Sequence, residues 1–252
     1  MRDANTGDHS LAASLASEAG RLLVDLRARV AADVDDPKAL GREGDAAAHE
    51  LLMRRLAAER PDDAVLSEEG VADPVRLDAE RVWIVDPLDG TREFGEVPRS
   101  DWAVHVALTI GGEPVAGAVA LPGRDLTLGT GPLAPDAPPA WDGAPRVLVS
   151  RSRPPAEALR IADVLGGELV PMGSAGAKAM AVVLGEADVY AHSGGQYEWD
   201  SCAPVAVARA AGLHTSRLDG SPLAYNRPDP YLPDLLICRP QLADAVIAAA
   251  RG

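Results

Sequence analysis

Residues 82–91 read VWIVDPLDGT, an apolar run that ends in two acids, a glycine and a threonine. The run 82–85 is short and mostly β-branched, which predicts a strand buried on both faces. Pro87 cannot donate a backbone hydrogen bond, so we expect the strand to leave the sheet there. Residues 89–91 predict a tight turn whose backbone N–H groups face an anion. This pattern favours a site that holds a metal ion and a phosphate together.

The composition restricts the class of protein. The chain has 252 residues, of which 47% are hydrophobic but only 4% aromatic, so its core must be built from small side chains. The net charge of −14 argues against binding to a nucleic-acid backbone, and a phosphate site in such a chain needs bound cations. Cys202 and Cys238 are too few for a disulfide framework, which favours a reduced, cytoplasmic protein. Residues 1–10 lack an apolar signal region, and no run approaches the roughly 20 residues needed to span a membrane.

The first half of the chain predicts helices followed by strands. Apolar residues at helical spacing, from Leu11 to Val30, predict an amphipathic helix. Residues 33–44 are polar and predict a loop, and a second helix is expected over 45–60. Asp45 would lie at the N-terminal end of that helix, where a simple capping role would also explain an acid. We expect further strands at residues 64–67, 102–110, 115–121 and 126–128, with a hairpin turn at Gly111-Gly112.

The second half alternates helix and strand signals. Residues 130–145 are rich in proline, alanine and glycine and predict a surface loop or a boundary between two halves. Strands are expected at residues 146–150, 169–172, 187–190 and 235–238, and helices at 156–165, 175–184, from just after Asp200 to Gly212, and 242–250. The chain is thus of the α/β class, with an α+β half (1–145) that carries most candidate ligands and a smaller α/β half (146–252) that completes the pocket.

Carboxylates near predicted strand ends and helix starts form the candidate metal site. They are Asp45, Glu68, Asp86, Asp89 and Asp200. The histidines do not have zinc-like spacing, and a set of carboxylates suits Mg²⁺ or Mn²⁺. Two ions about 3.5–4 Å apart can stabilise both the attacking and the leaving oxygen of an in-line displacement. Without cations such a cluster of like charges is unfavourable.

Two phosphatase mechanisms fit an acid pair followed by Gly-Thr. Haloacid dehalogenase-like enzymes phosphorylate an aspartate, but they use one residue between the two acids. Here two residues separate Asp86 from Asp89, which on an extended segment turns the second acid to the other face. The spacing therefore favours the second mechanism, in which a metal-activated water attacks and no covalent intermediate forms.

The motifs resemble the inositol monophosphatase superfamily over nearly the whole chain. The resemblance is carried by residues 86–91, by Glu68-Glu69 and by Trp199-Asp200, in the family's order. Within the superfamily, three segments look like the CysQ branch, the 3′(2′),5′-bisphosphate nucleotidases. These segments are Glu198-Trp199-Asp200, GSAGAK at 173–178 and LDGSPLAYN at 218–226. The fold implied is the layered α-β-α-β-α sandwich of the sugar phosphatases.

The resemblance also implies the metal ligands. It implies two Mg²⁺ sites, one held by Glu68, Asp86 and the backbone carbonyl of Leu88, and the other by Asp86, Asp89 and Asp200. Mn²⁺ would be a substitute, and lithium should inhibit.

The same resemblance assigns the groups around the water and the phosphate. Asp45 would lie near a third, weaker metal site and, with the Thr91 hydroxyl, would orient and deprotonate the attacking water. The N–H groups of Gly90 and Thr91 would cradle the phosphate. Glu69, next to the ligand Glu68, would not bind the metal itself but would orient a metal-bound water.

Three further residues are implied to contact substrate. Lys178 and Ser174 lie in a Gly/Ser-rich turn that suits a phosphate contact. An exposed helix lysine would explain Lys178 equally well, and a helix N-cap is the alternative for Ser174. Glu198 would contact substrate or lie at the rim of the pocket.

The activity implied is removal of the 3′-phosphate of adenosine 3′,5′-bisphosphate (PAP), giving AMP in sulfur assimilation, with its sulfated analogue PAPS as a second substrate. The alternatives are inositol monophosphatase and fructose-1,6-bisphosphatase activity on the same scaffold. The partner would be a small phosphorylated metabolite, with no nucleic acid or membrane, and the family suggests a homodimer.

Overall fold

The computed structural model describes residues 4–30, 36–71 and 73–251, with only the backbone of Val30. Its helices are α1 (Thr6–Val30), α2 (Pro37–Glu59), α3 (Thr91–Gly95), α4 (Ala156–Leu165), α5 (Ala175–Val183), α6 (Glu198–Ala210) and α7 (Ala243–Arg251). Its strands are β1 (Ala64–Ser67), β2 (Arg81–Asp89), β3 (Ala103–Ile110), β4 (Glu113–Leu121), β5 (Leu126–Gly129), β6 (Arg146–Ser150), β7 (Glu168–Met172), β8 (Val189–Tyr197), β9 (His214–Ser216) and β10 (Tyr231–Cys238). Short 3₁₀ turns are η1 (Pro74–Asp78), η2 (Pro122–Arg124), η3 (Gly131–Leu133) and η4 (Pro240–Leu242).

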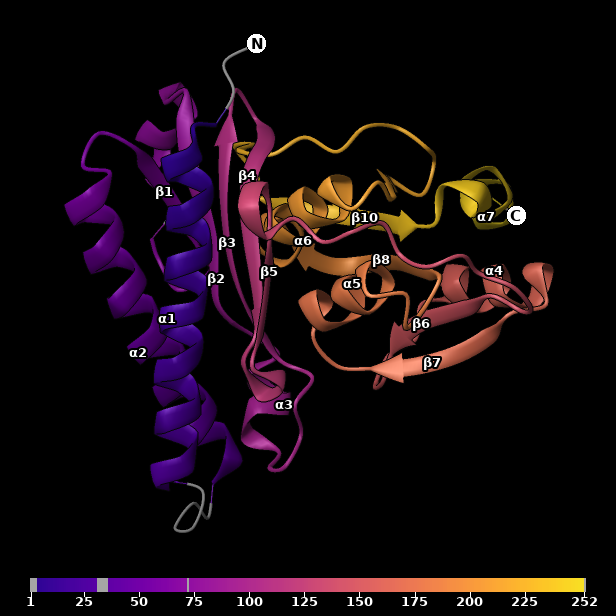
Figure 1. Cartoon of the computed structure of the whole chain (residues 1–252), viewed down its shortest axis with the longest axis horizontal. Coiled ribbons are helices and arrows are strands. Elements are labelled where there is room, and N and C mark those ends of the chain that lie inside the picture. The colour runs from indigo at the N-terminus through magenta and orange to yellow at the C-terminus, as the bar shows by residue number, and fades with distance from the viewer. Residues whose placement is uncertain (1–3, 31–35, 72, 252) are drawn as a thin grey trace.

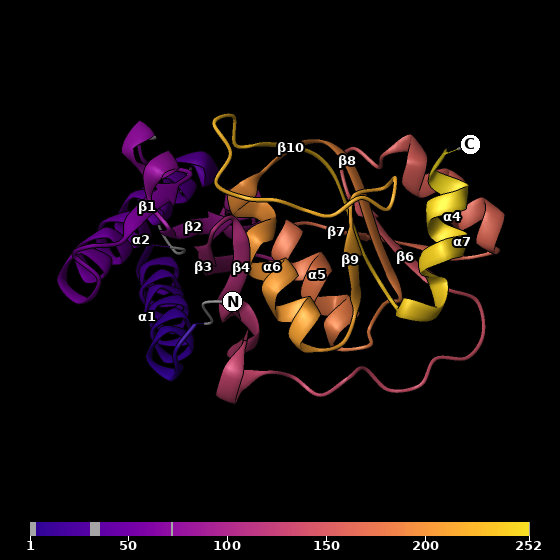
Figure 2. The same ribbon diagram turned by 90° about the horizontal axis from the view of Figure 1, so that it is seen from above.

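The elements form five layers, which confirms the predicted α-β-α-β-α sandwich. Helices α1 and α2 cover one face of a first sheet, α5 and α6 lie between that sheet and a second one, and α4 and α7 cover the outer face (Figures 1 and 2). The first sheet has the order β1-β2-β3-β4-β5, with only β1 and β2 parallel. The second has the order β7-β6-β8-β10-β9, in which β6 is parallel to both neighbours and β10 antiparallel to both.

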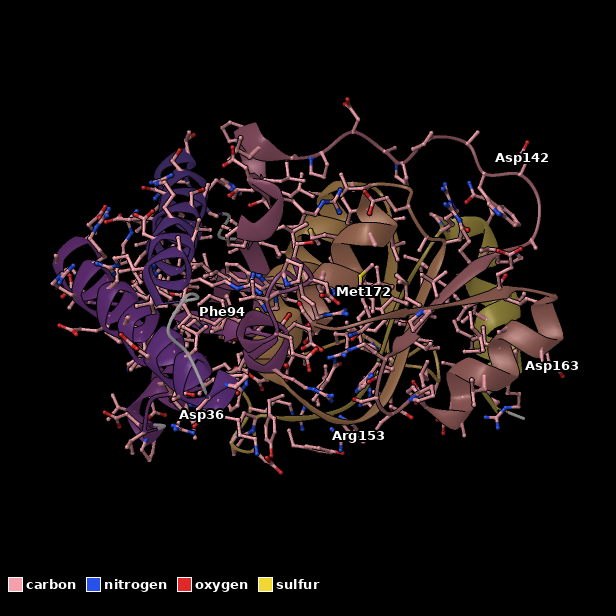
Figure 3. The ribbon with its side chains drawn as sticks, turned by 90° about the horizontal axis from the view of Figure 1, so that it is seen from below. Asp36, Phe94, Asp142, Arg153, Asp163 and Met172 are labelled. Carbon is pink, nitrogen blue, oxygen red and sulfur yellow. The ribbon has the colours of Figure 1, made fainter. Side chains whose placement is uncertain are left out.

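The middle layer joins the two sheets into one hydrophobic core. Buried Ile84 of the first sheet, Val182 of α5, Val205 of α6 and Leu235 of the second sheet belong to the same packed cluster. Helices α5 and α6 are rich in buried alanine, which lets them fit between two sheets, as the low aromatic content required. The two sheets divide the chain near residue 145, and the long connection that contains exposed Asp142 passes along the outside (Figure 3). Whether each half is a domain stays a prediction.

The largest difference from the sequence-based expectation is the start of α2. We expected a loop over residues 33–44 and a helix from Asp45, but the helix begins at Pro37, where a proline costs nothing because the first helical N–H has no partner. The Asp36 side chain caps it by accepting a hydrogen bond from the Lys38 N–H at 2.9 Å. Asp45 as an N-terminal cap was therefore wrong. Residues 33–35 of the expected loop lie outside the described part.

Other boundaries also differ. Strand β2 does not end at Pro87 but runs on to Asp89 past a bulge, and α6 begins at Glu198 rather than after Asp200. Strands β8 and β10 are longer than expected, and β9 was not predicted. Within the described ranges, no helix is long and apolar enough to cross a membrane.

Candidate metal and phosphate site

Three carboxylates meet where β2 ends and α6 begins. Asp86, Asp89 and Asp200 each offer an oxygen, and these atoms all lie within 4.8 Å of one another. On a regular strand, Asp86 and Asp89 would face opposite sides, as the sequence analysis assumed. A β-bulge between them, in the pairing of β2 with β3, changes the direction in which the second side chain points. Both acids can therefore serve one site.

Asp89 is the most firmly held of the three. It accepts hydrogen bonds from the Ser174 hydroxyl at 2.5 Å and from the N–H groups of Ala175 at 3.1 Å and Gly176 at 2.6 Å. The Nε2 atom of fully buried His105 lies 3.2 Å from its Oδ2. Burial alone would raise the pKa of Asp89, but His105 and these donors outweigh it and lower the pKa to about 2. Asp89 is thus a deprotonated carboxylate whose oxygens are held in fixed positions.

The neighbouring carboxyls are crowded. Burial, followed by the charges of Glu68, Asp89 and Asp200, raises the pKa of Asp86 well above its ordinary value. Burial and Asp89 raise the pKa of Asp200 to about 7, and burial and Asp45 do the same for Glu68, although part of that residue remains exposed. Protons or cations must therefore neutralise the cluster. An all-oxygen donor set of this kind fits Mg²⁺ or Mn²⁺.

These pKa shifts predict that the metal-free protein loses stability between about pH 4 and pH 7. The raised pKa values of Asp45, Glu68 and Asp200, each about 7, mean that the folded state holds protons that the unfolded chain releases. Their contribution is present at low pH and is lost as the pH rises through 7. His192, with its pKa lowered by burial to about 4, and His214, whose pKa burial also lowers, oppose them. Urea unfolding in a chelator at pH 5 and pH 8 should give the lower free energy of unfolding at pH 8, and saturating Mg²⁺ should remove the difference. Equal free energies of unfolding at pH 5 and pH 8 in the chelator would contradict the electrostatic repulsion among the clustered acids.

Thr91 and Asp45 face each other at the edge of the cluster. Gly90 has a left-handed conformation (φ 87°) and turns the chain from β2 into α3, of which Thr91 is the first residue. The Thr91 hydroxyl lies 3.2 Å from the Leu88 carbonyl oxygen and 3.4 Å from Asp45 Oδ1. Burial, followed by the charge of Glu69, raises the pKa of Asp45 to about 7. A carboxyl with such a pKa is suited to accept and return a proton near neutral pH.

A cleft of about 210 Å³ opens beside the cluster. It is lined by Asp89, Gly90, Arg92, Glu93, Ser150, Arg151, Ser152, Gly173, Ser174, Ala175, Lys178, Tyr190, His192, Gly195, Gln196 and Asp200. Its charged lining residues are the acids Asp89, Glu93 and Asp200 and the cations Arg92, Arg151 and Lys178, and Arg151 pairs with Glu93 at 2.7 Å. The cleft therefore offers both carboxylates for cations and basic groups for an anion.

Ser174 and Lys178 both lie in this cleft, and each also has a structural role. Ser174 caps α5 by accepting a hydrogen bond from the Ala177 N–H at 3.0 Å. The buried Lys178 ammonium donates to the carbonyls of Gly173 and Ser174 and lies 5.3 Å from the centre of the Tyr190 ring. Burial lowers its pKa. The surface-lysine explanation is therefore wrong.

Glu198 lies apart from the cleft. It is 1% exposed, and its two carboxylate oxygens accept hydrogen bonds from the N–H groups of Asn226 at 2.7 Å and Arg227 at 2.8 Å. It therefore fixes the loop before β10 and is not a rim residue. Its contact with substrate stays a prediction without geometric support. Trp199 stacks on Tyr197 with ring centres 4.9 Å apart, as expected for a packing residue.

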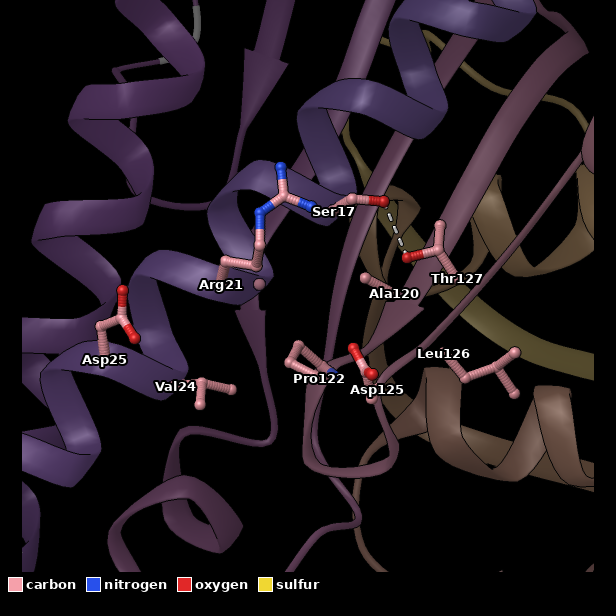
Figure 4. A pocket seen from close by; sticks show the side chains of 10 residues that line it. Ser17, Arg21, Val24, Asp25, Ala120, Pro122, Asp125, Leu126 and Thr127 are labelled. Atoms are coloured by element: carbon pink, nitrogen blue, oxygen red, sulfur yellow. Dashed lines mark hydrogen bonds between the residues drawn. The ribbon is translucent and has the colours of Figure 1, made fainter.

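A second hollow lies elsewhere, between α1 and the β4–β5 turn. It has a volume of about 460 Å³ and contains a hydrogen bond between the hydroxyls of Ser17 and Thr127 at 2.9 Å (Figure 4). None of the clustered acids lines it. We assign no chemistry to it.

Sequence reasoning missed several residues of the site. His105 is a buried histidine on an otherwise apolar strand, and that position was a usable signal for a partner of a buried acid. Ser150 ends β6 and Arg151 follows it, at the carboxyl end of a strand, where ligand-binding residues of α/β sheets commonly lie. No sequence pattern pointed to Tyr190 or Gln196 as site residues. They line the cleft because of the length and path of β8.

Comparison with known proteins agrees with this geometry. The sequence profile of the inositol monophosphatase family matches residues 8–131 and 145–252. A protein from Mycobacterium bovis named 3′-phosphoadenosine 5′-phosphate phosphatase is 53% identical over 239 residues, which cover 92% of this chain and 89% of the relative. A Mycobacterium leprae protein of the same name is 52% identical over 256 residues (97% and 93%). The Escherichia coli K12 3′(2′),5′-bisphosphate nucleotidase CysQ is 34% identical over 207 residues (75% and 80%).

Solved structures show the same fold. An inositol monophosphatase II from Staphylococcus aureus superposes with a TM-score of 0.81 at 21% identity, covering 96% of this chain and 95% of that one. An inositol monophosphatase from Zymomonas mobilis gives a TM-score of 0.76 at 24% identity and covers both chains fully. With its sequence profile, its relatives and its fold in agreement, this chain belongs to the inositol monophosphatase family.

Proposed function

We propose that this chain is a Mg²⁺-dependent phosphatase that removes the 3′-phosphate of PAP, giving AMP and phosphate. The observation that carries the reaction is the convergence of Asp86, Asp89 and Asp200 beside a cleft that Arg92, Arg151 and Lys178 also line. The choice of substrate is supported by the 52–53% identical relatives, which are named for that activity.

The residues fit the metal that the family implies. Glu68, Asp86 and the Leu88 carbonyl would hold one ion, and Asp86, Asp89 and Asp200 a second, with Asp45 near a third. When bound, these cations would neutralise the phosphate and make a water more acidic. The raised pKa values in the cluster support this assignment, since acids that oppose one another's ionisation would be stabilised as anions by bound cations.

The chain's own groups direct the water and the phosphate. The Thr91 hydroxyl would orient the attacking water and pass its proton to Asp45, whose pKa of about 7 suits that task. The N–H groups of Gly90 and Thr91 would hold the phosphate. Attack on phosphorus would form one P–O bond and break the bond to the ribose 3′-oxygen, which takes up a proton from solvent water and leaves as the hydroxyl.

The remainder of the substrate would occupy the cleft. Ser174 hydrogen-bonds Asp89, and Lys178 and Arg151 line the same cleft, so a second phosphate would meet positive charge there as it displaces Glu93 from Arg151. Glu69, next to Glu68, would orient a bound water from outside the ligand set. A cytoplasmic homodimer acting in sulfur assimilation, on PAP and on PAPS, completes the proposal.

Phosphate release in Mg²⁺ tests the proposal. PAP, inositol 1-phosphate and fructose 1,6-bisphosphate should be compared by kcat/KM, with and without Li⁺. We expect PAP to be preferred and its hydrolysis to be inhibited by lithium. Preference for inositol 1-phosphate or the sugar bisphosphate would keep the fold and the metal site but overturn the substrate. Trapping of a phosphoaspartate at Asp86 would overturn the mechanism.

A further inference from the structure

The first turns of α2 pack unusually closely against the segment that carries Thr91. Gly41 lies four residues before Asp45, so both lie on the same face of the helix. A Cβ atom at Gly41 would lie 2.6 Å from the Thr91 Cγ2 methyl and 3.2 Å from the Thr91 carbonyl oxygen. Both positions are buried or half-buried. The space that a side chain at Gly41 would need is therefore already filled by the Thr91 methyl.

The contact continues along the helix. At Gly44, a Cβ would meet Phe94, Leu88 and Leu23 at 2.9–3.2 Å, so glycine again allows the close approach. Phe94 lies beside α2 in Figure 3 and is fully buried. Helices normally disfavour glycine, yet this one carries two within four residues, both at its contact with Thr91 and its neighbours. The two glycines lower the stability of the helix, but they allow it to pack closely against Thr91 and its neighbours.

The direction of the Thr91 hydroxyl depends on where its methyl lies. The two groups share Cβ, so fixing the methyl fixes the hydroxyl. With the methyl against Gly41, the hydroxyl lies 3.4 Å from Asp45 Oδ1 and 3.2 Å from the Leu88 carbonyl oxygen. A serine at position 91 would have no methyl group for the contact with Gly41 to hold in place.

We propose that Gly41 is a positioning residue, whose missing side chain forms the notch that holds the Thr91 methyl and so aims the Thr91 hydroxyl at Asp45. The inference rests on the proposed roles of Thr91 and Asp45. It adds a residue that contacts neither substrate nor metal. It also explains why threonine, rather than serine, follows Gly90.

A cycle of substitutions tests the notch. Gly41→Ala should lower kcat about 10- to 100-fold with little change in KM, because misplacement of a reacting group by about 1 Å costs up to that factor. Thr91→Ser should lose about threefold, since the hydroxyl then samples three staggered rotamers. The double variant G41A/T91S adds a methyl on one side and removes it on the other, so its kcat should equal or exceed that of T91S.

Gly20→Ala is the matched control, because its Cβ would clash with the Pro122 ring at 2.8 Å but on α1, away from Thr91. It should lower Tm and leave kcat unchanged. The double variant also covers the case in which Gly41→Ala alone does not fold, since it removes the 2.6 Å clash with the methyl and leaves only the 3.2 Å approach to the carbonyl oxygen of residue 91. Full turnover by G41A would contradict the proposal. So would a kcat of G41A/T91S that lies below that of T91S by the same factor that separates G41A from the unaltered protein.

Two further variants separate this inference from the proposed function. Thr91→Ala and Asp45→Asn should each lose turnover if the proton relay is right. If both remain active, the relay is wrong and the inference falls with it. If both are inactive while G41A is fully active, only the inference is wrong.

Discussion

Asp86→Asn should abolish turnover without destabilising the metal-free protein. Asp86 is proposed to contact both cations, so its loss should cost several kcal/mol of transition-state stabilisation, or at least about 10³-fold in kcat/KM. In a chelator the same change replaces a buried carboxyl, whose ionisation burial and the neighbouring acids already oppose, with a neutral amide. The amide oxygen can still accept the hydrogen bond from the Leu88 N–H, which is 3.0 Å long. Phosphate release and urea unfolding in EDTA measure the two effects.

The control is Glu43→Gln, which makes the same charge change on the exposed face of α2. It should leave both turnover and stability unchanged. An Asp86→Asn protein with full activity would refute the metal assignment. One that unfolds much more easily in EDTA would refute the electrostatic crowding.

Asp188→Ala should be the most damaging substitution outside the site. Asp188 is fully buried, and its carboxylate accepts hydrogen bonds from the Arg239 side chain at 2.7 Å and from the Arg146 side chain at 3.0 Å. Arg239 is 5% exposed, so the substitution would leave its guanidinium buried without this partner. Breaking a buried pair in this way costs about 3–5 kcal/mol in the free energy of unfolding. Urea unfolding measures the loss.

The chain offers a matched surface pair. Arg124 and Glu186 form an ion pair at 2.5 Å with both side chains exposed. Glu186→Ala should therefore cost no more than about 1 kcal/mol. Equal losses for the two variants would mean that burial does not decide the strength of the Asp188 pair.

The layered fold was predictable because local patterns agreed with it. The apolar run 82–85, the Gly111-Gly112 hairpin and the alternation of helix and strand after residue 146 were all confirmed as elements. The start of α2 was missed because polar residues around Pro37 predict a loop unless a helix cap at Asp36 is recognised. The small β9 depends on pairing with β10, which no local pattern encodes.

The cluster of Asp86, Asp89 and Asp200 was predictable, whereas its surroundings were not. Motif spacing placed the acids at the ends of elements, and the structure brings these three together. The bulge that turns Asp86 and Asp89 to one side depends on the pairing of β2 with β3. Likewise, the hydrogen bonds that occupy Glu198 depend on a loop folded back from residues 226–227.

The position of α6 between the two sheets has a consequence during synthesis on the ribosome. Asp86 and Asp89 leave the ribosome well before the helix that brings Asp200 and covers the first sheet. Until then the nascent chain has an open apolar surface and an incomplete set of acids. A chain that stops before α6 therefore exposes this apolar surface and lacks one of the three clustered acids. Closure of the core and completion of the acid cluster thus depend on the same folding event.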